Sequence, residues 1–197
     1  INIIKPSKID NGSLPVMVWF HGGGYNFGNG DGLYITDRFA KRDVILVTMN
    51  YRLGPFGFFA HPLLSEASKM GVSGNYGTLD QIQALKWVQT NIHLFGGDPD
   101  NVTIFGESAG GASVETLVST KLAKDLFHKA IAQSGYTVGR ARNIREQRGD
   151  LISAESLGEK FFHSISGIDN PSVEDIKNLS ADLFFESEIF EKENDSE

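Results

Sequence analysis

The chain has 197 residues, of which 40% are hydrophobic and 22% charged, and it contains no cysteine. This composition is typical of a packed globular domain, and it excludes a collagen-like chain, a disulfide framework and a thiol nucleophile within these residues. The formal charge is −7, but residues 182–197 alone carry seven acidic residues and one lysine, so the rest of the chain is almost neutral. A nearly neutral body argues against nucleic acid as a partner, and no apolar run approaches the ~20 residues of a membrane span.

Four short apolar runs, bounded by polar residues or glycine, predict buried strands. They lie at residues 16–20, 44–49, 102–105 and 130–133, the last being the weakest. A short helix is expected over residues 34–42. From Leu79 to Phe95, apolar residues recur at spacings of three and four, which predicts a helix with one apolar face and with Asp80, Gln81, Lys86 and Gln89 off that face.

Another helix should follow Ser108, and the residues beyond about 145 have the character of charged helices. Ser172 is a candidate cap for one of them. Strands that alternate with helices predict an α/β fold. We therefore expect a partial α/β fold with a mainly parallel sheet flanked by helices and a helical C-terminal portion.

A G-x-S-x-G motif, Gly106-Glu107-Ser108-Ala109-Gly110, stands directly between the predicted strand 102–105 and the helix that follows. A nucleophilic serine on a tight strand-to-helix turn needs small residues two positions before and after it, and the turn pushes the hydroxyl out of the sheet. Ser108 is thus a candidate nucleophile. The alternative is a loop rich in glycine and serine that merely caps a helix.

A glycine loop, His21-Gly22-Gly23-Gly24, follows the first predicted strand. Acyl transfer needs N–H donors aimed at the oxygen that becomes negative, and glycine lets the backbone approach it closely. The expected donors are the amides of Gly23 and Gly24, together with that of Ala109. Three glycines after a strand could also bind phosphate, but the sequence has neither a G-x-G-x-x-G nor a Walker-type Gly-Lys-Ser/Thr.

Several further segments, read with the two motifs, resemble type-B carboxylesterases, the carboxylesterase/cholinesterase family. They are His21–Tyr25, Asn50–Phe58, Gly74–Gly77 with Asp80-Gln81, Phe95–Pro99, Asn101–Phe105 running into the serine motif, and Gln133–Gly135. Within the family, our impression is of an insect-type α-esterase. The resemblance implies the α/β-hydrolase fold and hydrolysis of a small-molecule carboxylic ester without metal or organic cofactor.

The resemblance also implies roles for individual residues. Ser108 would be the nucleophile, with Gly23, Gly24 and Ala109 as oxyanion donors. Arg52 and Asp80 would form a buried ion pair that ties a loop to the long helix. Glu107 would belong to a polar network near Ser134, although an acid at a helix start can also act simply through the helix dipole.

The triad of this fold follows the chain order serine, acid, histidine, so its base should follow Ser108. Only His128 and His163 do. His128 lies just before a strand, and His163 more plausibly forms a solvated pair with Glu159 on one helix face. The other histidines, His21, His61 and His93, precede the serine and are expected to be structural or exposed.

We therefore expect residues 1–197 to be an internal fragment of a single α/β-hydrolase domain, with both ends of the domain and the acid and histidine of the triad outside the sequence. The start of the sequence has no signal-peptide pattern, and the compartment stays open. Without a base the serine is a weak nucleophile, so the isolated fragment should have little or no esterase turnover.

Two other functions are compatible with parts of the pattern. A catalytically silent adhesion or binding protein can use the same fold, because fold does not fix function, but such relatives typically lack the serine. A hydrolase of the hormone-sensitive-lipase type also has a His-Gly-Gly-Gly loop. The segments 50–58 and 95–99 favour type B over that group.

Overall fold

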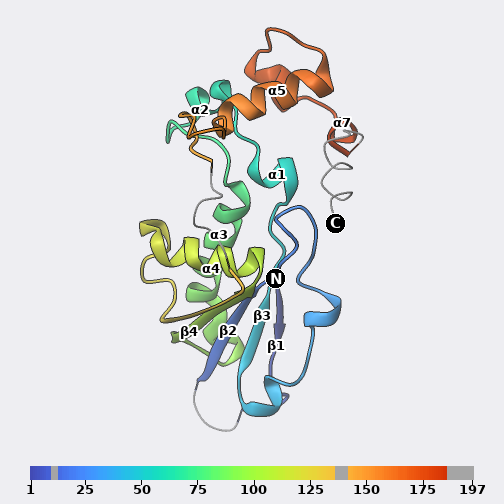
Figure 1. Cartoon of the computed structure of the whole chain (residues 1–197). Helices are drawn as coiled ribbons and strands as arrows, with labels where there is room; N and C mark the ends of the chain where they lie inside the picture. The colour runs from blue at the N-terminus through green and yellow to red at the C-terminus, as the bar shows by residue number, and fades with distance from the viewer. Residues whose placement is uncertain (10–12, 136–141, 186–197) are drawn as a thin grey trace. The chain divides into compact units, whose positions relative to one another are not determined.

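The computed structural model describes residues 1–9, 13–135 and 142–185 (Figure 1). The chain folds as two compact units. Unit 1 comprises Ile1–Gly57 and Tyr76–Ala141, and unit 2 comprises Phe58–Asn75 and Arg142–Glu197. Within the described ranges, every helix is too short or too polar to cross a bilayer.

Unit 1 contains a five-stranded sheet in the order β1-β3-β2-β4-β5. The strands are β1 (Asn2–Ile4), β2 (Leu14–Phe20), β3 (Ile45–Thr48), β4 (Gly97–Glu107) and β5 (Lys129–Gln133). All neighbours are parallel except β1, which pairs antiparallel with β3. The mainly parallel sheet and its four expected strands are confirmed. The fifth strand, β1, has only three residues, too few for a periodic pattern.

Two helices cover one face of this sheet, α3 (Tyr76–Asn91) and α4 (Ala109–Ser119) (Figure 1). Alternate residues of the central strands, such as Val18 and Ile104, are fully buried against them. The expected helix over 79–95 is confirmed, ending in a 3-10 turn, η3 (Ile92–Phe95). Its apolar face was predicted only in part: Leu79 is 38% exposed, whereas Gln81 is fully buried.

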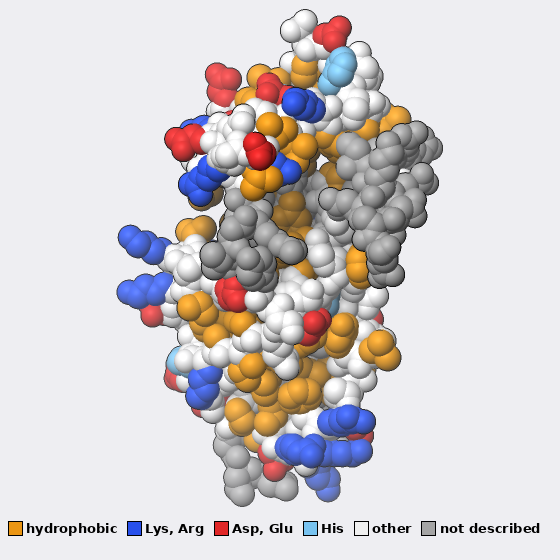
Figure 2. Space-filling view, in the orientation of Figure 1, with side chains coloured by type: hydrophobic (Ala, Val, Ile, Leu, Met, Phe, Trp, Pro, Cys, Tyr) orange, Lys and Arg blue, Asp and Glu red, His pale blue; other side chains and the backbone are white. Residues whose placement is uncertain are grey.

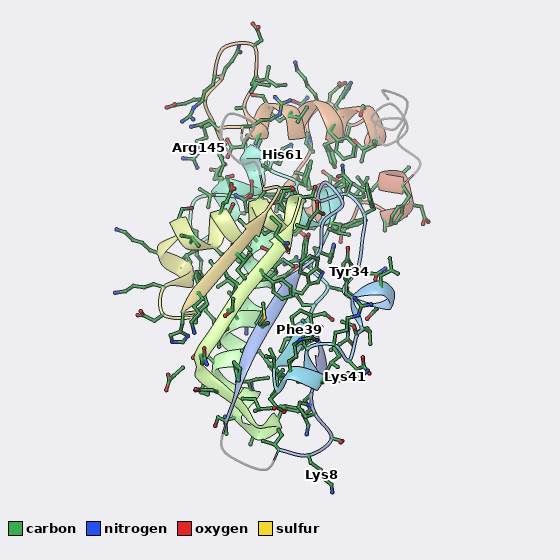
Figure 3. All side chains as sticks on the ribbon, turned by 60° about the horizontal axis from the view of Figure 1, so that its bottom comes forward. Lys8, Tyr34, Phe39, Lys41, His61 and Arg145 are labelled. Atoms are coloured by element: carbon green, nitrogen blue, oxygen red, sulfur yellow. The ribbon has the colours of Figure 1, made fainter. Side chains whose placement is uncertain are left out.

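The other face of the sheet carries an aromatic cluster. Trp19 contacts the rings of Tyr34 and Phe105 at centroid distances of 5.0 and 4.8 Å, and Phe39 packs on Phe105 (Figure 3). The helix predicted over 34–42 is wrong, because this segment forms two 3-10 turns, η1 (Gly32–Tyr34) and η2 (Ala40–Arg42). On a continuous α-helix Tyr34 and Phe39 would point about 140° apart, so they could not both pack on the sheet.

Strand β5 is paired with β4, but the prediction that this run is buried is wrong, because β5 is the last strand of the described sheet and is exposed along its whole length. Its central apolar residue, Ile131, is 46% exposed. Figure 2 shows hydrophobic side chains gathered over the strands of unit 1 on the side that faces the viewer. A short 3-10 turn, η4 (Lys121–Ala123), connects α4 to β5.

Unit 2 is helical, as expected for the C-terminal portion. Its helices are α2 (Pro62–Ala67), α5 (Ala154–Ser166), α6 (Val173–Lys177) and α7 (Ala181–Phe185); α1 (Gly54–Phe58) spans the boundary between the units. Ser172 caps α6 as predicted, in a reciprocal capping box with Asp175. Gly158 of α5 lies so close to the Ala60 carbonyl that an added Cβ would stand 1.7 Å from its oxygen.

Candidate active site

Ser108 occupies the turn between β4 and α4. Its backbone has φ 55° and ψ −120°, a conformation that non-glycine residues rarely adopt. Such strain costs of order 1–3 kcal/mol and persists only where the surroundings hold it. Two hydrogen bonds do so: the Ser108 N–H donates to the Gln133 carbonyl, and its own carbonyl accepts from the Ala112 N–H, both at 2.9 Å.

The Ser108 side chain is exposed, and its hydroxyl makes no capping bond to α4. Serine at the first position before a helix usually turns its oxygen back to the helix N–H groups. The left-handed backbone prevents that here, because a capping residue needs an extended conformation. The hydroxyl therefore takes no part in capping α4.

The small residues of the motif are required by backbone contacts. A Cβ on Gly110 would stand 2.0 Å from the Phe20 carbonyl oxygen, and one on Gly106 would stand 2.4 Å from the Gly110 carbonyl. Strands β2 and β4 and the first turn of α4 thus meet at backbone distance. A larger residue at either position would push the helix away from the sheet.

The glycine loop lies directly against this turn. A Cβ on Gly22 would stand 2.9 Å from the Glu107 carbonyl oxygen and 3.3 Å from the Ser108 Cβ. The next two glycines have φ values of +106° and +59°, which favour glycine. Around Gly24 there is open space, since among the described residues no atom beyond Gly24 and its two chain neighbours comes within 4 Å of where its Cβ would be. The structure therefore brings the serine turn and the glycine loop together.

Tyr51 anchors the start of this loop. Its hydroxyl donates to the His21 carbonyl at 2.7 Å, and the two rings stack at 4.3 Å. Burial raises the pKa of Tyr51, with smaller contributions from Tyr25 and Tyr34, so its hydroxyl keeps its proton. Burial also lowers the pKa of His21, which favours the neutral ring. Further along, the Tyr25 carbonyl accepts from the Gly54 N–H at 2.7 Å.

The ion pair expected between Arg52 and Asp80 is present, but it is not buried. The guanidinium donates through Nε and Nη2 to the two carboxylate oxygens, both at 2.8 Å, and the Arg52 N–H donates to the same group. The Arg52 side chain is 53% exposed and that of Asp80 28%. Arg52 lies on the outside of its loop, over the ring of Tyr76, so water screens the pair.

Charge and burial act in opposite directions on the Asp80 pKa. Burial raises it, but the hydrogen bonds from Arg52 outweigh this and leave the pKa below its ordinary value. The pair still joins the loop after β3 to α3, as the resemblance implies.

Glu107 and Ser134 lie at one end of the sheet. Glu107 ends β4 opposite Gln133, and Ser134 follows directly after β5 in a left-handed conformation, with φ 50°. Both are exposed. Their supporting role stays a prediction.

His61, His128 and His163 have hydrogen-bond or charge partners other than Ser108. His128 accepts from the Val102 N–H through Nδ1, and His61 accepts from the Leu63 N–H at the start of α2. His163 pairs with Asp169 at 3.4 Å rather than with Glu159. Within residues 1–9, 13–135 and 142–185, no group of three His, Cys, Asp or Glu side chains could hold a metal ion.

A sequence profile described as the carboxylesterase family matches residues 1–170. The chain belongs to the carboxylesterase family. It is 42% identical over 200 residues to para-nitrobenzyl esterase of Bacillus subtilis, covering 98% of this chain and 38% of that protein. It is 50% identical over 135 residues to fumonisin B1 esterase of Sphingopyxis macrogoltabida, covering 68% of this chain and 25% of that protein.

Solved structures of this family share the fold. A PNB esterase aligns with a TM-score of 0.78 at 41% identity, over 92% of this chain and 36% of that one. Juvenile hormone esterase from Manduca sexta, with OTFP covalently attached, aligns with a TM-score of 0.73 at 34% identity, over 90% and 32%. The α/β-hydrolase fold is confirmed. The insect subtype stays a prediction.

Sequence reasoning missed the side chains that hold the glycine loop in place, above all Tyr51 and the buried pair of Gln81 and Ser113. Gln81 donates to Ser113 at 2.9 Å. The available sequence signal was Gln81, a polar residue beside the apolar face of α3. Such a residue is equally compatible with a position exposed to solvent.

Proposed function

We propose that the protein containing this chain is a serine carboxylic-ester hydrolase, with Ser108 as its nucleophile. The observation that carries the proposal is the meeting of an exposed, strained Ser108 with the glycine loop at backbone distance. Membership of the carboxylesterase family supports it. The chain spans about 38% of the length of para-nitrobenzyl esterase, so the substrate preference belongs to the whole protein.

In the proposed reaction, the Ser108 Oγ attacks the ester carbonyl carbon while its proton passes to a base. The carbonyl oxygen becomes negative and accepts hydrogen bonds from the amides of Gly23, Gly24 and Ala109. The tetrahedral intermediate then collapses, the C–O bond to the alcohol breaks, and the alcohol takes the proton. Water attacks the acyl-serine in the same way, which releases the acid and restores the hydroxyl.

The proposed oxyanion donors come from two elements. Gly23 and Gly24 lie in a loop whose positive φ values turn its peptide units, and Ala109 is the first residue of α4, where N–H groups have no partner within the helix. A single such donor contributes roughly 3 kcal/mol to transition-state stabilisation. The helix dipole adds to this, because negative charge is favoured at a helix N-terminus.

The base of the proposed reaction is a histidine outside residues 1–197, oriented by an acid that also lies outside them. The contacts of His128 and His163 support this, since each is hydrogen-bonded or paired elsewhere. Glu107 and Ser134 would assist from the end of the sheet. No metal or organic cofactor takes part in this scheme.

The test is covalent labelling of the intact protein with a fluorophosphonate probe, together with hydrolysis of 4-nitrophenyl butyrate. We expect the wild type to be labelled at Ser108 and to turn over the ester, and Ser108→Ala to lose both. Ser119→Ala is the matched control, because Ser119 is an exposed serine at the other end of α4. A wild type that neither reacts nor hydrolyses would instead favour a binding protein, and equal labelling of Ser108→Ala would exclude this nucleophile.

A further inference from the structure

A buried hydroxyl lies one helical turn beyond the proposed nucleophile. Ser113 is on α4 and is 1% exposed. Its Oγ contacts three groups: the Ala109 carbonyl at 3.0 Å, the Tyr25 hydroxyl at 3.2 Å and the Gln81 Nε2 at 2.9 Å. These groups belong to α4, to the glycine loop and to α3. One side chain therefore joins all three elements around the site.

The chemistry of the side chains limits which group donates and which accepts in each contact of Ser113. The Gln81 amide nitrogen can only donate, so the Ser113 oxygen accepts from it. A serine hydroxyl has one proton and two lone pairs. Ser113 therefore accepts from Gln81 and directs its one proton toward the Ala109 carbonyl and the Tyr25 hydroxyl, which both lie within hydrogen-bond distance.

The contacts of Ser113 lie next to the proposed oxyanion donors on both sides. Ala109 supplies one donor, and Ser113 binds the carbonyl of that same residue. Tyr25 directly follows Gly24, which supplies another donor, and its left-handed backbone, with φ 65°, needs restraint. Ser113 therefore links the two segments that carry the proposed donors.

If the cluster served only to stabilise the fold, its buried polar groups would carry an unnecessary free-energy cost. Gln81 is fully buried, and its Oε1 has no hydrogen-bond partner among the described residues. A buried acceptor left unpaired costs about 1–3 kcal/mol. Leucine at position 81 and alanine at position 113 would fill the same interior without that penalty. The free-energy penalty is understandable if the polar cluster fixes the positions of α3, α4 and the glycine loop relative to one another.

We propose that Ser113 is a positioning residue that sets the spacing between the glycine loop and the first turn of α4. The inference rests on the proposed function, because it assigns Ser113 a part in stabilising the transition state of the same reaction. Ser113 does not contact the substrate. It acts through Tyr25 and Ala109.

The experiment compares Ser113→Ala, Tyr25→Phe and the double variant in the intact protein. The matched control is Thr116→Val, which removes a hydroxyl of α4 that donates to the Ala112 carbonyl at 2.9 Å, the same type of bond as that from Ser113 to Ala109. For hydrolysis of 4-nitrophenyl butyrate we expect kcat to fall about tenfold in Ser113→Ala, with KM changed less than twofold, because displaced donors weaken only the transition state. Thr116→Val should keep the wild-type kcat.

A trifluoromethyl ketone separates positioning from a general loss of stability. Its carbonyl accepts the serine oxygen and forms an anionic adduct that resembles the tetrahedral intermediate. In each variant the inhibition constant should rise by the factor by which kcat/KM falls. The double variant should be little worse than Ser113→Ala, because both changes break one link.

Three results would overturn the inference. Ser113→Ala could have the same kcat as Thr116→Val, or it could raise KM without lowering kcat. The third result is an inhibition constant for Ser113→Ala that equals the wild-type value while kcat/KM falls. If Ser113→Ala fails to fold, Tyr25→Phe decides the matter, since it keeps the ring and removes only the hydroxyl. Ser108→Ala separates the two proposals. An active Ser108→Ala would refute the proposed function, whereas an inactive Ser108→Ala beside an unimpaired Ser113→Ala would refute only the positioning role.

Discussion

Replacing Gly110 with alanine tests how the serine turn is held. An added Cβ would stand 2.0 Å from the Phe20 carbonyl oxygen and 2.9 Å from that of His21. Ordinary contact begins near 3.4 Å, so the first turn of α4 must retreat from β2 by about 1.4 Å. Because the obstacle is backbone, no side-chain rotation can relieve the clash.

Two effects of opposite sign decide the outcome. Alanine is a better helix former than glycine, which favours the variant by at most about 1 kcal/mol. Overpacking against a fixed structure costs about 1–3 kcal/mol, and sometimes more. Because the obstacle is backbone, the overpacking cost lies at the upper end of that range, so we expect Gly110→Ala to lower the free energy of unfolding by about 2 kcal/mol or more. Ester turnover should also fall, since the retreat moves Ser108.

The assay is denaturant unfolding of the intact protein, followed by circular dichroism. Gly32→Ala is the control: Gly32 has φ +57° but open space around its Cβ position, so alanine there meets only the left-handed strain of about 1–2 kcal/mol. Turnover should survive in Gly32→Ala and fall in Gly110→Ala. A Gly110→Ala protein as stable and as active as the wild type would refute the argument from backbone contact.

Two further predictions concern charge. His61 is 3% exposed, and burial lowers its pKa against the opposing effect of Glu159 and Glu155. Below pH ~6.5, His61 therefore binds a proton in the unfolded chain but not in the native state. The free energy of unfolding then falls as the pH drops from 7 to 5, by up to about 1.4 kcal/mol per pH unit. His61→Asn, which keeps an acceptor for the cap, should flatten this dependence in urea unfolding, and an unchanged slope would contradict it. Asp80→Asn should cost about 1 kcal/mol or less, and less still in 1 M salt, because its pair with Arg52 is exposed; a loss of 3 kcal/mol or more would show that the pair behaves as a buried one.

The sequence predicted best where one physical requirement determines several residues at once. The apolar run 102–105 predicts a strand, and the glycines around Ser108 favour a sharp turn, so the β4–Ser108–α4 segment follows from the pattern alone. Resemblance then added residues that no local pattern identifies, such as Arg52 and Asp80. The spacing that places them opposite each other comes from the packing of α3.

The failures share a cause, which is that tertiary contacts outweigh local preference. The segment 34–42 reads as a helix, yet Tyr34 and Phe39 both pack on the sheet and need a non-helical backbone between them. Gln81 reads as a solvated residue, yet it is fully buried, and its amide donates a hydrogen bond to Ser113. Exposure of the Arg52 side chain could not be predicted either, because it depends on which segments cover the loop.

Close backbone packing and buried polar links make different contributions to the site. At Gly106 and Gly110 the nearest atoms are all backbone, so the packing around the serine turn does not depend on side-chain rotamers. The strain at Ser108, of order 1–3 kcal/mol, is offset by two backbone hydrogen bonds of about 1 kcal/mol each. The glycine loop has no comparable packing around Gly24, and its anchors are the hydroxyls of Tyr51 and Tyr25. An added Cβ should therefore disturb Ser108, and the loss of a buried hydroxyl should disturb the glycine loop, so that the two kinds of substitution separate the proposed nucleophile from the proposed oxyanion donors.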